Sequence, residues 1–313
     1  MPEYISSFPT GFEEIVARHM PKNTEILQVY NGLIHYRGHS NVPFFNNSFH
    51  VLRFFEGKHL SFQRMVPEDK LRCPISEGSF RVRFSQSNQF VKVDRQVSLR
   101  AERAIAQATH LKLDRLNPTT ELWYVIRDEG IGFYGQLLRK RAATEKNLRP
   151  GELRPEFAYL MCLCANPAEQ SVVLDPFAGY GAIPAQIARH FPFGKLIVSD
   201  NDPEKVKALP GGAFCWDALH LSEIANASVD LIVTDPPWGY YGNIDDIALF
   251  YEKMLLEFKR VLKQNGRAVI LCARKEEFQR AVARTGAFAI ERTIHTLVNG
   301  KKAGVYVLTL LRG

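Results

Sequence analysis

The chain has 313 residues, of which 46% are hydrophobic, and this composition is ordinary for a protein with two or three well-cored domains. No run approaches the ~20 apolar residues of a membrane-spanning helix, and the N-terminus lacks the basic-then-apolar pattern of a signal peptide, so we expect a cytoplasmic protein. The net charge of +7 lies wholly in residues 1–150, which carry 22 Lys and Arg against 15 Asp and Glu; this favours a polyanion-binding first half or, equally, a basic solvated surface.

Residues 1–60 contain the signals of a small α+β domain, which we predict to be ferredoxin-like. A strand, a Pro/Gly turn and a helix open the chain. Ile26–Tyr30 and Leu33–Tyr36 are strand-like runs separated by Asn31-Gly32, a strong hairpin signal, and Val51–Phe55 predicts a further strand.

Residues 61–140 predict a second α+β unit. Phe80–Phe84 alternates like a half-buried strand, residues 97–108 carry apolar side chains at helical spacing, and an Asn-Pro turn leads into a strand at residues 122–126. This order, closed by a segment at residues 130–134 that begins Gly-Ile-Gly, resembles the THUMP domain, an RNA-binding module of tRNA-modifying enzymes.

A basic triplet, Arg139-Lys140-Arg141, ends this unit and predicts contact with RNA phosphates, the alternative being a solvated charge run. Residues 141–155 predict an ordered linker, because Leu148–Pro155 contains two prolines and a glycine. A helix is expected at residues 156–164.

Residues 156–313 predict a Rossmann-like domain, because strands and helices alternate regularly from Ser171 onward. The first strand, from Val172, runs into a glycine turn that reads D-x-F-x-G-x-G, whereas a dinucleotide-binding turn reads G-x-G-x-x-G. The acid beside the turn would repel a diphosphate but suits the ammonium group of S-adenosylmethionine. The predicted cofactor residues here are Asp175, Phe177, Ala178, Gly179 and Gly181.

Two further strands end in acids, at Leu196–Asp200 and Phe214–Asp217. Asp200 would accept hydrogen bonds from a ribose diol, and Asp217 one from the adenine amino group. Each acid alone could instead be a helix N-cap or a turn residue. Together with their neighbours, the predicted cofactor residues are Asp200, Asn201, Asp217 and Ala218.

The buried strand Leu231–Thr234 ends abruptly at Asp235-Pro236-Pro237-Trp238 because proline cannot continue a ladder. A carboxylate and a main-chain carbonyl can each accept one N–H from an exocyclic amine, and an aromatic ring can stack on its base, so we predict that these four residues catalyse amino methylation. The alternative is a Pro-Pro turn with Trp238 as a packing residue. The stretch resembles the (Asp/Asn)-Pro-Pro-(Tyr/Phe/Trp) motif of S-adenosylmethionine-dependent amino-methyltransferases.

The last predicted strands are residues 268–272, 287–297 and 305–311, with a tight turn at Asn299-Gly300. The five cysteines are scattered without C-x-x-C spacing, and the histidines show no metal-ligand spacing, so we expect reduced thiols and no metal site.

Three segments, LDPFAGYG at Leu174–Gly181, TDPPWG at Thr234–Gly239 and GELRP at Gly151–Pro155, resemble the THUMP-containing family of tRNA guanine-N2 methyltransferases. The resemblance implies a class I methyltransferase domain with a mostly parallel seven-stranded sheet and an antiparallel last strand. It also implies S-adenosylmethionine as cofactor, tRNA as partner, including its 3′ end, and methylation of a guanosine in the acceptor stem or at its junction with the D-arm.

The chain departs from the family pattern in the segment 202–213, which is shorter than usual, at Trp238, where Tyr is commoner, and at Tyr180 and Ile183, which replace small or hydroxyl residues. The short segment motivates one alternative, an RNA-binding adaptor that has lost turnover. A DNA amino-methyltransferase is another, but the THUMP-like half argues against it. We expect a monomer.

Overall fold

The computed structural model describes residues 1–39, 41–66, 75, 77–140, 148–209, 211–240 and 244–311. It divides into two compact units: the first comprises residues 1–8 and 19–142, and the second residues 9–18 and 143–313. The chain therefore enters the second unit briefly near its start before it builds the first.

The first unit is built on a nine-stranded sheet in the order β2-β3-β1-β4-β9-β8-β5-β6, with β7 paired to β5. Its helices are α2 (Phe62–Met65) and α3 (Arg95–Thr109). The strands are β1 (Glu3–Ser7), β2 (Glu25–Tyr30), β3 (Leu33–Arg37), β4 (Ser48–Glu56), β5 (Ser79–Gln86), β6 (Gln89–Phe90), β7 (Lys112–Leu113), β8 (Thr120–Ile126) and β9 (Ile131–Arg139).

Strand β9 joins the two sequence-defined halves of this unit. It pairs antiparallel with β4 on one side and with β8 on the other, so residues 1–60 and 61–140 share one sheet. Both segments therefore lie in one compact unit, and the division at residue 60 and the names ferredoxin-like and THUMP for the two halves remain predictions. The hairpin at Asn31-Gly32 is confirmed by the antiparallel pairing of β2 with β3.

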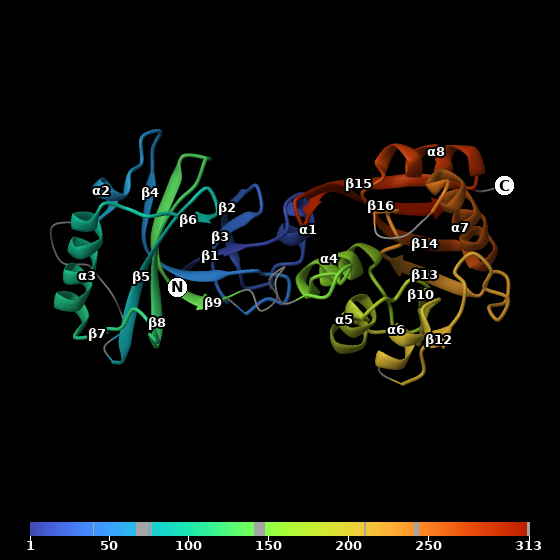
Figure 1. Ribbon diagram of the computed structural model, residues 1–313, viewed down its shortest axis with the longest axis horizontal. Coiled ribbons are helices and arrows are strands. Elements are labelled where there is room, and N and C mark those ends of the chain that lie inside the picture. The colour runs from blue at the N-terminus through green and yellow to red at the C-terminus, as the bar shows by residue number, and fades with distance from the viewer. Residues whose placement is uncertain are drawn as a thin grey trace. The chain divides into compact units, whose positions relative to one another are not determined.

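Strand β8 is buried on both faces. Leu122, Tyr124 and Ile126 belong to an apolar cluster with α3, while Trp123 and Val125 belong to a second cluster that includes Phe49 and Phe133. Because successive strand residues point to opposite faces, the unit has a core on each side of the sheet. Helix α3 begins where the Asp94 side chain accepts a hydrogen bond from the Gln96 N–H (2.7 Å), and it covers one of these faces (Figure 1).

The second unit is a seven-stranded sheet in the order β12-β11-β10-β13-β14-β16-β15. The strands from β12 to β14 are parallel, and β16 is antiparallel to both β14 and β15. This is the class I methyltransferase fold expected from the sequence. The strands are β10 (Val172–Asp175), β11 (Lys195–Asp200), β12 (Phe214–Cys215), β13 (Val229–Thr234), β14 (Leu262–Cys272), β15 (Phe288–Val298) and β16 (Lys301–Leu310).

Helices pack on this sheet as Figure 1 shows. Alternate strand residues such as Leu174, Ile232 and Ile270 join α7 and α8 in one large apolar cluster, and their buried neighbours Val173 and Val233 face the other side. The helices are α1 (Glu13–Arg18), α4 (Pro155–Ala165), α5 (Ala182–His190), α6 (Pro203–Ala208), α7 (Ile247–Val261) and α8 (Lys275–Thr285). None of the helices among the described residues is long and apolar enough to cross a membrane.

The excursion of residues 9–18 into the second unit is fixed by packing. The Phe12 ring meets the Phe157 ring of α4 edge-on at 5.3 Å, and Arg292 of β15 bonds Glu14 of α1 at 2.9 Å. A side chain at Gly11 would place its Cβ 2.0 Å from the His295 carbonyl oxygen, so only glycine fits there. Residues 1–8 thus belong to the first unit and residues 9–18 to the second, which the sequence pattern did not indicate.

Candidate active site

Four neighbouring strands of the second unit deliver the predicted site residues to one edge of the sheet. In spatial order β12, β11, β10 and β13 are parallel, so their carboxyl ends share that edge. Strands β10 and β11 end at Asp175 and Asp200, while Asp217 and Asp235 follow β12 and β13. Ligands of open α/β sheets bind at such an edge.

The glycine turn after β10 is held by hydrogen bonds to β11. The Ala178 N–H donates to the Ser199 carbonyl (2.9 Å), and the Gly179 N–H donates to Asp200 Oδ2 (2.8 Å). Gly179 has φ +56° with open space around its Cβ position, whereas a Cβ at Gly181 would lie 2.6 Å from the Leu209 side chain. The turn therefore presents bare backbone toward the edge.

The linker segment reaches this turn. The Arg149 guanidinium lies 4.7 Å from the centroid of the Tyr180 ring, and the Arg149 N–H donates to the Glu152 carboxylate (2.9 Å). Arg154 lies 3.6 Å from Glu156 at the start of α4. The GELRP segment thus lies in the same unit as the glycine turn, and its preceding arginine contacts that turn.

Asp200 supports the glycine turn through its side chain. Its Oδ2 accepts from Gly179, its Oδ1 accepts from the Asp202 N–H (3.0 Å), and Lys205 Nζ lies 3.8 Å away. A carboxylate has about four lone-pair sites, so two remain for a diol. Asn201 is exposed beside it, and its carbonyl accepts the Cys215 thiol (3.8 Å).

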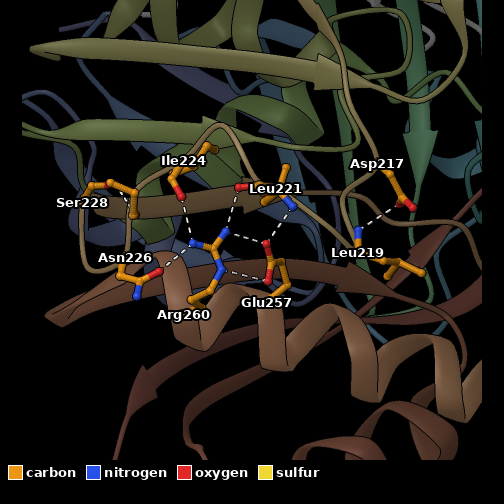
Figure 2. Close-up of polar contacts among 9 residues, drawn as sticks. Asp217, Leu219, Leu221, Ile224, Asn226, Ser228, Glu257 and Arg260 are labelled. Atoms are coloured by element: carbon orange, nitrogen blue, oxygen red, sulfur yellow. Dashed lines mark hydrogen bonds and ion pairs between the residues drawn. The ribbon is translucent and has the colours of Figure 1, made fainter.

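The loop after β12 is pinned by α7, as Figure 2 shows. The Arg260 guanidinium donates to the carbonyls of Leu221 (2.7 Å) and Ile224 (2.8 Å) and to the Asn226 side chain (2.7 Å), while Glu257 accepts from the Leu221 N–H (2.7 Å). Arg260 and Glu257 also pair at 2.6 Å. These bonds fix the loop that follows Asp217.

Asp217 accepts a hydrogen bond from the Leu219 N–H at 2.9 Å (Figure 2). Asp217 is exposed and Ala218 is buried. It lies two residues beyond the end of β12, which is shorter than the strand expected over residues 214–217. The preceding Trp216 ring stacks on Phe214 at 4.2 Å. The acid therefore stands at the start of a loop and not on the strand.

The turn after β13 is held from two sides. The Tyr251 hydroxyl of α7 donates to the Pro237 carbonyl (3.1 Å), and Arg274 Nε donates to the Trp238 carbonyl (3.2 Å). Within the described part of the chain, no hydrogen bond reaches the Pro236 carbonyl or Asp235 Oδ1, and Asp235 Oδ1 is buried. Two acceptors thus remain on a turn that is otherwise fixed.

Burial changes the acid–base behaviour of the central carboxyls. It raises the pKa of Asp235 to about 8, and the neighbouring Asp175 charge adds to this while the Trp238 indole opposes it. Burial likewise raises the pKa of Asp175 to about 7, although Asp175 Oδ1 accepts the Thr234 hydroxyl at 2.7 Å. Asp175 Oδ2 is buried without a hydrogen-bond partner among the described residues.

The basic triplet lies in the other unit. Arg139 ends β9 and donates to the carbonyls of Val42 and Pro43, Lys140 is exposed, and Arg141 lies outside the described residues. The Arg139 donors are thus partly used within the unit. We therefore regard Lys140 as the better candidate for an RNA contact.

Comparison with known proteins agrees with this geometry. Residues 200–303 match the family model described as "RMKL-like, methyltransferase domain". The matched stretch lies within the second unit. It runs from the last residue of β11 to the first residues of β16 and contains the turn at Asp235.

Relatives extend the similarity beyond residues 200–303. The chain is 30% identical over 236 residues to mouse tRNA (guanine(6)-N(2))-methyltransferase THUMP3, covering 66% of this chain and 46% of the relative. It is 26% identical over 220 residues to a Thermus thermophilus tRNA (guanine(6)-N2)-methyltransferase, covering 66% of this chain and 65% of the relative. The chain thus spans about half the length of the mouse relative.

Solved structures share the whole fold. TrmN from Thermus thermophilus superimposes with a TM-score of 0.77 at 20% identity, covering 99% of this chain and 100% of TrmN. SMU.472, a protein solved in complex with SAH, superimposes with a TM-score of 0.72 at 13% identity, covering 100% of this chain and 99% of that protein. Both solved structures therefore share the fold of this chain.

Sequence reasoning missed the residues that hold the site loops: Tyr251, Glu257, Arg260 and Arg274. Arg274 follows the end of β14, so extending the strand-end argument by one strand would have found it. The others lie on α7, where a Tyr or a Glu-Arg pair at helical spacing looks like any amphipathic helix.

We expect Arg260→Met to lower the free energy of unfolding by about 1–3 kcal/mol, because it removes charge-assisted hydrogen bonds to the loop at residues 221–226. Urea unfolding measures this loss. Lys259→Met is the matched control, since it removes the same charge from the neighbouring exposed position. Equal unfolding midpoints for the two variants would contradict the assignment.

The buried carboxyls predict a pH dependence of stability. The unfolded chain releases these protons near pH ~4, so between about pH 4 and about pH 8 the folded protein holds more protons and its free energy of unfolding falls as pH rises. Asp235→Asn should reduce this fall, as measured by urea unfolding at several pH values. Asp217→Asn, the same substitution at an exposed carboxyl, is the control, and a parental slope in Asp235→Asn would refute the prediction.

Proposed function

We propose that the protein is an S-adenosylmethionine-dependent methyltransferase that methylates the exocyclic N2 amino group of a guanosine in tRNA, in the acceptor stem or at its junction with the D-arm. The observation that carries this proposal is Asp235 Oδ1, a buried acceptor without a donor among the described residues, in the turn that also carries Trp238. A buried acceptor of this kind suits an N–H group that arrives with the substrate.

The relatives support the choice of base and nucleic acid. The mouse and Thermus proteins are both named as methyltransferases of the N2 group of tRNA guanine 6. Guanosine 6 is therefore the first position to examine in this protein. Another relative is named for tRNA guanine 10 and a further one for U6 snRNA. Methylation of these two RNAs should therefore be measured beside that of tRNA guanosine 6.

The cofactor residues fit S-adenosylmethionine. The unpartnered Asp175 Oδ2 beside the glycine turn suits its ammonium group, Asp200 suits its ribose diol, and Asp217 suits its adenine amino group. Bound there, the cofactor supplies a methyl group on a positively charged sulfur. Phe177, Ala178, Gly179, Gly181, Asn201 and Ala218 would line the same pocket.

The turn after β13 would activate the amine. The guanine N2 nitrogen is a poor nucleophile because its lone pair is delocalised into the ring, and hydrogen bonds to Asp235 and the Pro236 carbonyl would turn that lone pair toward the methyl group. Trp238 would stack on the base, which is worth roughly 1–3 kcal/mol. Pro237 stiffens the turn.

Asp235 would also take the proton that the amine releases as its nitrogen gains the methyl group. Its pKa of about 8 lies near the working pH, which suits a general base. The positive charge of the cofactor would favour the ionised carboxylate. One side chain would therefore both orient the amine and accept its proton.

Asp235→Ala should abolish methyl transfer, whereas Asp235→Asn should retain part of it because an amide oxygen still accepts one N–H. Trp238→Ala should lower turnover and Trp238→Tyr should be tolerated. The assay is methyl transfer to unmodified tRNA with mass mapping of its nucleosides. A parental rate in Asp235→Ala would overturn the catalytic role.

The control for that assay changes the RNA. Replacing the target guanosine with inosine removes only the exocyclic amine, so methylation at that site should disappear. Persistent methylation of the inosine would place the reaction on another atom. Binding of tRNA without any binding of S-adenosylmethionine would instead identify an RNA-binding adaptor.

We further propose that the first unit binds the tRNA 3′ end. Removing the 3′-terminal nucleotides should then weaken binding to the full chain at fixed salt, and equal affinity for both RNAs would leave a nonspecific polyanion surface. Lys140→Ala should lower the salt slope of binding by about 0.7–0.9, the value for one lost phosphate contact. Lys58→Ala, which removes the same charge at another exposed position, should leave the slope unchanged.

A further inference from the structure

Two cations converge on one exposed aromatic ring beside the catalytic turn. Tyr240 lies two residues after Trp238, and 42% of its surface is exposed. The Arg274 guanidinium lies 4.6 Å from its ring centroid and the Lys301 ammonium 3.8 Å. Both distances are within the range of a favourable cation–π contact.

The two cations come together because of the sheet topology. Arg274 follows the end of β14, and Lys301 is the first residue of β16. Since β14 and β16 are antiparallel neighbours, with Cys272 paired to Gly304, the start of β16 lies at the same edge as the end of β14. The ring and both cations belong to the second unit.

Arg274 connects this cluster to the catalytic turn. Its Nε donates to the Trp238 carbonyl at 3.2 Å while its guanidinium carbon lies over the Tyr240 ring. The Trp238 and Tyr240 rings meet edge-on at 6.3 Å. Whatever binds the cations therefore lies close to the ring that would stack on the substrate base.

The two cations lie near one acid of the same unit. Glu277 is 3.9 Å from Arg274. Lys275, next to Arg274, lies 3.2 Å from His295 Nδ1. An arginine and a lysine held a few Å from one ring repel each other, and an anion between or beside them would relieve this.

The acids of the site lie on the other side of Asp235. Along the sheet edge Asp217, Asp200 and Asp175 follow β12, β11 and β10, while Arg274 and Lys301 belong to β14 and β16. A polyanionic strand that presents a base to Asp235 is repelled on the first side and attracted on the second. The favourable path for its backbone therefore runs over the cations.

We propose that Tyr240, Arg274 and Lys301 form a phosphate-binding subsite for the RNA strand, which holds a phosphate next to the nucleotide whose base enters the Asp235–Trp238 turn. This inference rests on the proposed function, because it takes RNA as the substrate. Arg274 and Lys301 contact the phosphate oxygens, and the Tyr240 ring keeps the two cationic groups in place.

The test compares Lys301→Ala with Lys302→Ala in binding of the full protein to an unmodified tRNA transcript at several salt concentrations. Neighbouring strand residues point to opposite faces of a sheet, and Lys302 is exposed. The two variants therefore remove the same charge from opposite faces of β16. Lys301→Ala should weaken binding about 3- to 10-fold and lower the salt slope by about 0.7–0.9, with S-adenosylmethionine affinity unchanged. Lys302→Ala should behave like the parent protein.

A chemically made tRNA identifies the phosphate itself. An uncharged methylphosphonate next to the target guanosine should weaken binding to the parent protein, and it should weaken binding to Lys301→Ala by a smaller factor, because that variant has already lost one of the two contacts to the phosphate. Independent, additive losses would overturn the subsite. So would a Lys301→Ala variant that loses stability or turnover with a parental salt slope, since that result describes a purely structural contact.

The binding measurements need no turnover, so this inference and the proposed function fail separately. If the protein methylates no guanosine, the comparison of Lys301→Ala with Lys302→Ala still reports the phosphate contact. If methylation occurs and the two variants bind tRNA equally, the proposed function stands and the subsite is refuted.

Discussion

The burial of two carboxyl groups at the ends of adjacent strands is the constraint that shapes this edge of the second unit. Asp175 is the last residue of β10 and Asp235 follows β13, and burial raises the pKa of both carboxyls. Removing a carboxylate from water without full compensation costs on the order of several kcal/mol, and the Thr234 hydroxyl and one backbone N–H are the donors that Asp175 receives. The large apolar core beneath the strands offsets this cost. A ligand with a positive charge and N–H donors would reduce this burial cost. The buried carboxyls would therefore favour such a ligand over an anionic one.

The loops at this edge gain their fixed geometry from helices and not from the motifs themselves. Arg260 and Glu257 hold the loop after β12, Tyr251 holds the Pro237 carbonyl, and Arg274 holds the Trp238 carbonyl. Each contact uses a main-chain acceptor or donor of the loop, so it fixes backbone position and leaves the loop's own side chains available. Reactions that rely on orientation need such support, because small displacements of the acceptors reduce the rate strongly.

Strands and hairpins could be predicted from the sequence where a local residue pattern determines them. Apolar β-branched runs that end in Asp175, Asp200 and Asp235 identified strands and the edge at which they end. The Asn31-Gly32 and Asn299-Gly300 turns identified hairpins, and both hairpins are confirmed. In each case the signal lies within about ten residues, which is the range over which periodicity and turn chemistry act.

Long-range partners were outside the reach of these patterns. Nothing local to Gly11 indicates that residues 9–18 pack against β15, and nothing local to β9 indicates that it joins β4 to β8 in one sheet. The expected boundary at residue 60 followed from the local order of strand and helix signals, whereas strand pairing places both segments in one sheet. Arg139 looked like a phosphate contact because it lies in a basic triplet, yet its guanidinium donates to two carbonyls of its own unit. Charge in a sequence shows where cations are, and only the fold shows which of them are already in use.

The order of strands also sorts charge along the active edge, and this follows from the antiparallel insertion of β16. A last strand parallel to its neighbours would begin at the opposite edge and would carry Lys301 away from the site. Because β16 runs the other way, its first residue lies at the same edge as Arg274, which follows β14, and both contact the Tyr240 ring. The edge therefore carries acids on the β10–β12 side of Asp235 and these two cations on the β14–β16 side. A cationic cofactor would be attracted to the acidic side of such an edge and repelled by the basic side. An anionic RNA strand would be attracted to the basic side and repelled by the acidic side. The single reversed strand would therefore allow two ligands of opposite charge to meet at one carboxylate without competing for the same surface.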